Sequence, residues 1–143
     1  MKKLIPAFFA LAIASCDTAK QSTASNESIV GKHWRLVELY GKIVQQSALN
    51  KDAHLLLDAD EKRISGSGGC NSFFGGYELP GNNSIQFLNM GATKMACPGN
   101  VMQVEQEFFE ALGNTTEFVV KKDTLLLLKQ ASVLAKFVVS DTR

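Results

Sequence analysis

The chain has 143 residues, with 15 Lys and Arg against 14 Asp and Glu, so its formal net charge at pH 7 is +1. This length suits one domain with a hydrophobic core. Most of the affinity of proteins for nucleic acids comes from neutralising phosphates with basic side chains, so a near-neutral chain without a basic stripe is not expected to bind nucleic acid.

The first 16 residues, MKKLIPAFFALAIASC, have the organisation of an export signal: two lysines, an apolar run and small residues before Cys16. The apolar run is too short for a stable membrane-spanning helix. Residues 13–16, IASC, resemble the bacterial lipobox, in which the cysteine receives lipid after cleavage. We therefore expect residues 1–15 to be a lipoprotein signal peptide and Cys16 to be lipidated. The alternative is an ordinary signal peptide with an incidental cysteine.

Residues 16–28 are predicted to be the lipidated cysteine and a flexible tether, because DTAKQSTASNES holds almost only small polar side chains. Such a segment cannot bury enough surface to offset the entropy of ordering. The folded domain is then expected over residues 29–143. These features predict a cell-envelope protein, anchored to a membrane by lipid and facing the periplasm. Asp17 resembles the inner-membrane retention signal of enteric bacteria, but the choice of membrane stays open because lineages differ in sorting.

From residue 29 the pattern is typical of β-structure, with aromatic and branched residues between turn-forming ones. The segment SGSGGCNSFFGGYEL ends as a strand in which Phe73, Phe74 and Tyr77 point to alternate faces. Its Gly75 and Gly76 predict a bulge or bend. Strands are predicted over residues 32–41, 55–57, 63–67, 71–79, 85–90, 118–121, 125–128 and 133–139.

One segment has helical periodicity and predicts an amphipathic helix from Val101 to Leu112. Its apolar stripe is Val101, Val104, Phe108 and Leu112, widened by Phe109. The polar side is expected to hold most of Gln103, Glu105, Gln106, Glu107 and Glu110. Asn100 is a candidate N-cap, Gln103 completes a capping box, and Gly113 is a C-terminal stop.

These elements predict an α+β fold that is mainly β. We expect a curled antiparallel sheet or partly closed barrel of about eight strands, with the one amphipathic helix packed across it.

The glycine-rich segment around Cys70 allows three interpretations: a phosphate-binding loop, a nucleophile on a loop, or scaffold. A phosphate loop needs a helix N-terminus and usually a lysine, and this segment leads into a strand without one. A cysteine nucleophile needs a base, and the two histidines, His33 and His54, both fall in predicted strands. Both catalytic and phosphate-binding roles are therefore disfavoured.

Cys70 and Cys97 are the two cysteines that remain once Cys16 is lipidated. In an oxidising compartment such a pair is most often a disulfide, which we favour. Met90 and Met95 would add soft sulfur donors beside Cys97, so a Cu(I)-like site is the sharper alternative. Both interpretations stay open from the residues alone.

Two motifs carry a family resemblance. The first is Gly-Cys-Asn-x-Phe, and the second is Thr-x-Met-x-Cys some 25 residues later; they comprise Gly69, Cys70, Asn71, Phe73, Thr93, Met95 and Cys97. With the opening GKHWRLVEL and the terminal DTLLLL and LAKF, these residues resemble the META domain family, also called heat-shock HslJ-like. The resemblance covers residues 30–139.

The resemblance implies a small bacterial envelope protein, often a lipoprotein, built as a curled antiparallel sheet with a helix. Some members are linked to heat shock or to resistance to a hydrophobic antibiotic, and no enzymatic activity is established for the family in general. We therefore expect a non-enzymatic envelope lipoprotein without cofactor that supports stress or antibiotic tolerance by binding a partner protein or a small apolar compound. The alternative function is a soft-metal or redox protein that uses Cys70, Cys97, Met90 and Met95. In either case the glycines allow close backbone approach, and Asn71 is expected to bond backbone groups at this corner.

Overall fold

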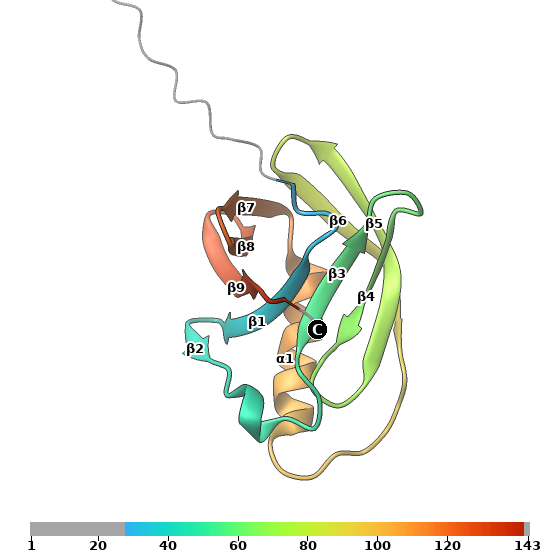
Figure 1. Ribbon diagram of the computed structural model, residues 1–143, viewed down its shortest axis with the longest axis vertical. Coiled ribbons are helices and arrows are strands. Elements are labelled where there is room, and N and C mark those ends of the chain that lie inside the picture. Colours follow the sequence, from blue (N-terminus) through green and yellow to red (C-terminus); the bar gives the residue numbers. More distant parts are fainter. Residues whose placement is uncertain (1–27, 142–143) are drawn as a thin grey trace, which may run out of the picture.

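The computed structural model describes residues 28–141, which form an antiparallel β-barrel with one α-helix (Figure 1). The strands are β1 His33–Leu39, β2 Lys42–Ile43, β3 His54–Asp58, β4 Arg63–Ser67, β5 Ser72–Gly81, β6 Ser84–Ala92, β7 Glu117–Lys121, β8 Thr124–Lys129 and β9 Ser132–Val139. The helix α1 is Val101–Asn114, and a short 3-10 helix, η1, covers Gln46–Ala48. In this described part no helix is long and apolar enough to cross a membrane.

The strands pair in a ring. From β3 to β9 each strand pairs antiparallel with the next, and β1 pairs with both β3 and β9, which closes the sheet on itself. The two-residue β2 lies outside this ring, beside β1. The expected fold class is confirmed: a curled, partly closed antiparallel barrel with one helix packed across it.

The ring is weakest between β6 and β7. These two strands share a single residue pair, Ser84 with Glu117, whereas β5 and β6 pair along most of their length. The helix α1 connects β6 to β7 in the chain and packs against β1, β6, β8 and β9. The barrel is therefore open on the side where α1 lies.

The hydrophobic core fills the barrel beneath α1. Phe108 of α1 is completely buried, and its ring centroid lies 5.6 Å from that of Phe73 on β5 and 5.7 Å from that of Phe137 on β9. Trp34 of β1 is also fully buried, and its indole N–H donates to the carbonyl oxygen of Ile29 over 2.7 Å. The helix thus joins the two halves of the sheet through aromatic contacts.

Most predicted strands are present, with differences at their ends. The first strand stops at Leu39 because Tyr40 and Gly41 adopt φ values of 47° and 77°, which turn the chain into the short β2 that the sequence pattern did not predict. The bulge expected at Gly75 and Gly76 is confirmed by the register shift between Phe74 and Gly76. Phe73 and Tyr77 are buried while Phe74 is half exposed, as the alternation predicts.

The helix begins where predicted, with Asn100 at the N-cap position, but the predicted capping bonds are absent and the helix does not stop at Gly113. The Asn100 side chain makes no capping hydrogen bond, and the Gln103 amide donates to Glu107 instead of completing a capping box. The helix also continues through Gly113 to Asn114. At the end of the helix the Thr115 hydroxyl donates to the carbonyl oxygen of Ala111 over 2.7 Å. This bond satisfies a carbonyl group of the last turn, so the helix end does not need a glycine cap.

Candidate functional site

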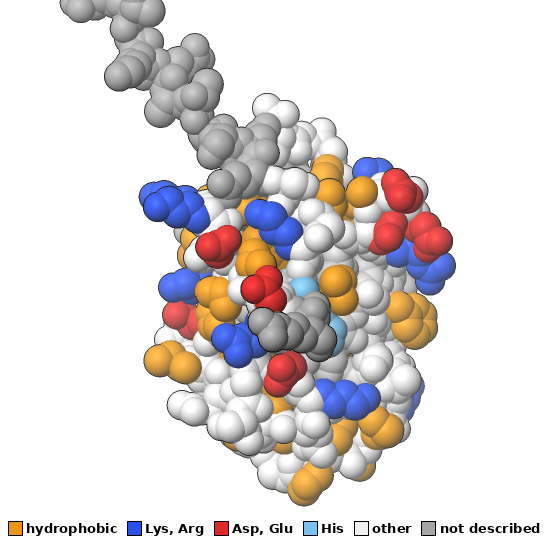
Figure 2. Space-filling view, viewed as in Figure 1, with side chains coloured by type: hydrophobic (Ala, Val, Ile, Leu, Met, Phe, Trp, Pro, Cys, Tyr) orange, Lys and Arg blue, Asp and Glu red, His pale blue; other side chains and the backbone are white. Residues whose placement is uncertain are grey.

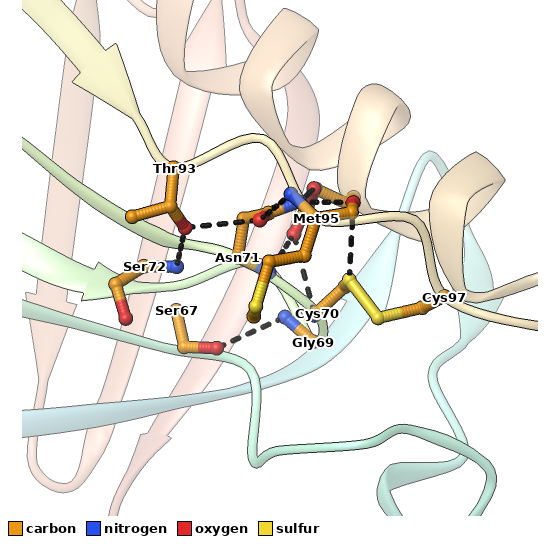
Figure 3. The surroundings of a disulfide bond; sticks show 9 residues. Ser67, Gly69, Cys70, Asn71, Ser72, Thr93, Met95 and Cys97 are labelled. Carbon is orange, nitrogen blue, oxygen red and sulfur yellow. Dashed lines mark hydrogen bonds between the residues drawn. A yellow bond between two sulfur atoms is a disulfide. The ribbon is translucent and has the colours of Figure 1, made fainter.

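The two sequence motifs meet at one corner of the barrel. Cys70, in the connection between β4 and β5, forms a disulfide with Cys97, in the segment between β6 and α1 (Figure 3). The two Cα atoms lie 6.1 Å apart, a usual separation for a disulfide. The disulfide therefore ties the glycine-rich corner to the segment that leads into α1.

Asn71 organises this corner with its whole side-chain amide. Its Oδ1 accepts hydrogen bonds from the Thr93 hydroxyl over 2.9 Å and from the Met95 backbone N–H over 2.7 Å (Figure 3). Its Nδ2 donates to the Met95 carbonyl oxygen over 3.1 Å and to Glu105 Oε1 over 2.6 Å. The amide thus makes all four of its hydrogen bonds, which gives both the asparagine and the threonine of the motifs a structural role.

Glu105 is the largest departure from the sequence analysis, which placed it on the solvent-facing side of the helix. Glu105 is only 4% exposed. Its carboxylate accepts hydrogen bonds from the backbone N–H groups of Cys70 and Asn71 over 3.3 and 2.6 Å, and a third from the side-chain amide of Asn71. A signal was present in the sequence. Position 105 lies four residues after Val101 and three before Phe108, so it shares the buried side of the helix.

The glycines of the corner allow this carboxylate to approach the backbone. A Cβ added at Gly68 would lie 2.6 Å from Glu105 Cγ, so a larger residue would displace the side chain. Gly69 has φ of 107°, a conformation that side-chain-bearing residues rarely adopt. The glycine-rich segment is therefore scaffold that receives Glu105 from α1.

We expect Glu105→Ala to lower the free energy of unfolding by about 2 to 3 kcal/mol, because buried N–H donors lose their acceptor. Glu105→Gln should cost less, since its amide oxygen can still accept one of these bonds. Glu110→Ala, at an exposed position of the same helix, is the matched control and should change stability by less than about 0.5 kcal/mol. Urea unfolding measures all three. Similar values for Glu105→Ala and Glu110→Ala would contradict the buried assignment.

The structure does not support Cys70 as a nucleophile, because its sulfur is bonded to Cys97. The candidate bases His33 and His54 lie on the neighbouring strands β1 and β3, with their rings stacked 4.4 Å apart. His33 Nδ1 lies 2.6 Å from the Ser140 hydroxyl, and His54 Nδ1 lies 2.8 Å from the Asp52 carbonyl oxygen. Partial burial, together with the neighbouring His54, lowers the pKa of His33.

The soft-metal alternative loses two of its four sulfur donors to the disulfide. Of the two remaining sulfur donors, the Met95 side chain is half exposed, and Met90 lines a groove between α1 and β6. Among residues 28–141, no group of three or more His, Cys, Asp or Glu side chains could hold a metal ion. With both sulfurs in the disulfide, the structure provides no pair of thiolates for a site of Cys70, Cys97, Met90 and Met95.

Next to the motif corner lies a cavity of about 330 Å³ between α1 and β6, which we call the α1–β6 groove. Phe73 of β5 contributes to it, Phe109 and Gly113 form the helix wall, and the strand wall consists of Phe87, Met90, Gly91 and Ala92. No lining residue is charged. This size and apolar lining are typical of sites that bind small ligands or apolar side chains.

Sequence reasoning selected Phe73 and Met90 but missed Phe87, Phe109 and Gly113 as parts of a site. Phe109 was interpreted as an extension of the core stripe, and Gly113 as a helix stop. The signal that could have identified Phe109 and Gly113 is their spacing, since residues four apart share one helix face. Which strand this face would meet could not be read from spacing.

The fold and this corner define a class: a small antiparallel barrel whose single helix is held to a glycine-rich turn by a disulfide and a buried carboxylate. The chain matches the family model of the META domain over residues 27–141, and it therefore belongs to the META domain family.

Solved structures share the fold at low sequence identity. A protein from Burkholderia xenovorans, solved by NMR, has a TM-score of 0.65 and 20% identity, with 98% of this chain and 99% of that chain covered. A DUF4847 family protein from Bacteroides vulgatus, solved by crystallography, has a TM-score of 0.52 and 17% identity, with 75% of this chain and 91% of that chain covered. No curated protein matches the chain.

Proposed function

We propose that this META domain protein is a non-enzymatic lipoprotein of the bacterial cell envelope that binds an uncharged apolar group in the α1–β6 groove. The observation that carries the proposal is the groove itself: an apolar cavity of about 330 Å³ on the open side of the barrel, with no charged residue in its lining. In this role the protein would support stress or antibiotic tolerance by holding apolar compounds or apolar parts of a partner near the membrane.

The disulfide and the export signal support the envelope location. Disulfides persist in oxidising compartments such as the bacterial periplasm and are rare in the cytosol. The uncharged lining of the α1–β6 groove supports apolar recognition. On the face shown in Figure 2, basic and acidic side chains are interspersed and form no broad field of one sign.

Gly113→Phe tests the groove directly. A Cβ at Gly113 would meet no atom within 4 Å, so a side chain can be added at this point of the groove wall. We expect this variant to bind the uncharged dye N-phenyl-1-naphthylamine about tenfold more weakly than the wild type, measured by fluorescence titration. Its melting temperature should be equal or higher, because glycine is unfavourable inside a helix by about 1 kcal/mol.

Gly113→Ala is the matched control for this change. It also removes the glycine, with a larger gain in helix propensity, but adds only a methyl group, so it should retain dye binding. Equal dye affinity in the wild type and in Gly113→Phe would place the dye elsewhere and reject the groove as the site.

The anchor is tested at Cys16, which lies outside the described residues. Cys16→Ala should move the protein from the membrane fraction to the soluble or unprocessed pool, because the lipid attachment point is lost. Fractionation of cells followed by immunoblotting measures this. Unchanged membrane association would contradict lipidation at Cys16.

A further inference from the structure

The strand wall of the α1–β6 groove is also a free strand edge. Along β6, residues 86–92 have β5 on one side, but β7 pairs only at Ser84, so in the described residues no strand pairs with the other side of this stretch. A free edge of this kind presents backbone N–H and C=O groups that can pair with another extended chain.

The direction of these groups follows from the neighbouring hydrogen bonds. The Ile85 N–H donates to Thr116 just before β7 over 3.1 Å, and the Thr93 N–H donates to Ser72 of β5 over 3.0 Å. Successive residues of a strand direct their backbone groups to opposite sides. The groups of Phe87, two residues after Ile85, and of Ala92, one residue before Thr93, therefore point to the open side.

The shape of this place favours one extended segment over a second folded copy. Helix α1 forms the opposite wall with Phe109 and Gly113, so the free edge lies inside a groove and not on a flat rim. The register shift near Gly76 and the φ of 50° at Asn89 also bend β6. A flexible segment can follow this short, bent edge, whereas the fixed strand of a second folded copy would need a long, regular one.

We propose, building on the proposed function, that the α1–β6 groove binds an extended polypeptide segment. The segment adds to β6 as a strand between Phe87 and Ala92, and it places one apolar side chain among Phe73, Phe87 and Phe109. Backbone hydrogen bonds to β6 supply much of the affinity, and the apolar pocket selects the side chain. The partner is thus a protein with a flexible segment of alternating polar and apolar residues.

The test uses the chain without its signal peptide and a short synthetic peptide of alternating threonines and apolar residues, with phenylalanine at its centre. We expect the peptide to displace N-phenyl-1-naphthylamine and to slow hydrogen exchange of the Phe87 and Ala92 amides, measured by NMR. Two series of N-methylated peptides are compared. The first series has methyl groups on alternate backbone N–H groups, and the second has them on the N–H groups in between. One series should bind about tenfold more weakly and the other nearly as well as the parent, because only one set of N–H groups faces β6.

Ala92→Pro provides the matching change in the protein. Proline removes the N–H at the open edge and keeps a small apolar side chain, and prolines are tolerated on strand edges. Because Ala92 also lines the groove, dye affinity is measured alongside, and the variant should lose about tenfold more affinity for the peptide than for the dye. Ala92→Val, which retains the N–H, is the control: any effect of its larger side chain on the groove should change dye and peptide affinity to a similar extent.

The outcomes separate the two proposals. If Gly113→Phe abolishes dye binding but the peptide does not bind the wild type, the groove is a small-molecule site and the strand proposal is wrong. Equal affinity for both N-methylated series would overturn it too, because backbone pairing would then contribute nothing. If neither the dye nor the peptide binds, both proposals are wrong.

Discussion

Phe108→Ala should lower the free energy of unfolding by about 3 to 5 kcal/mol, the usual cost of removing a large aromatic side chain from a packed core. The Phe108 ring has no exposed surface and lies against Phe73 and Phe137, which belong to opposite parts of the sheet. Its loss removes buried contacts and leaves a cavity between helix and barrel. Urea unfolding followed by circular dichroism measures the change.

Glu107→Ala is the control on the neighbouring residue. Glu107 is partly exposed, and its ion pair spans 3.7 Å to Lys42, whose side chain is 71% exposed. Such an exposed pair contributes little, so this variant should change stability by less than about 0.5 kcal/mol. Comparable losses for Phe108→Ala and Glu107→Ala would show that the buried face of α1 is assigned wrongly.

Reducing the Cys70–Cys97 disulfide should destabilise the domain by a similar amount. The bond closes a loop of about 28 residues, for which the chain-entropy relation gives roughly 3.6 kcal/mol. A reductant should therefore lower the melting temperature markedly. Replacing both cysteines, Cys70→Ser with Cys97→Ser, should have about the same effect, and this double variant should no longer respond to reductant.

Mass spectrometry of the freshly purified, unreduced protein after alkylation decides the disulfide directly. We expect Cys70 and Cys97 to escape alkylation. Modification of both cysteines would contradict the disulfide and restore the soft-metal hypothesis, which needs free thiols.

Local patterns in the sequence determined the type and position of most elements. The alternation of Phe73, Phe74 and Tyr77 predicts a strand with one buried face, and the structure confirms it. The spacing of Val101, Phe108 and Leu112 predicts a helix, because residues three and four apart share one helix face. These predictions succeed since each depends on neighbours in the chain. The paired motifs, taken as a resemblance, also identified the family.

The corner and the groove were decided by tertiary structure. Glu105 was predicted to be solvent-facing because its charge is usually exposed, yet the corner supplies two backbone N–H groups and an amide that compensate the cost of burying a carboxylate. These partners come from residues 70 and 71, more than 30 positions away, and periodicity cannot report on them.

The α1–β6 groove depends in the same way on contacts between distant segments. It exists because β6 and β7 share only one residue pair, and because Gly113 continues the helix past its predicted stop to form part of the wall. Sequence patterns determine which face of each element is apolar. Only the packing of the partly closed barrel decides which apolar faces are covered and which one remains open beside a free strand edge.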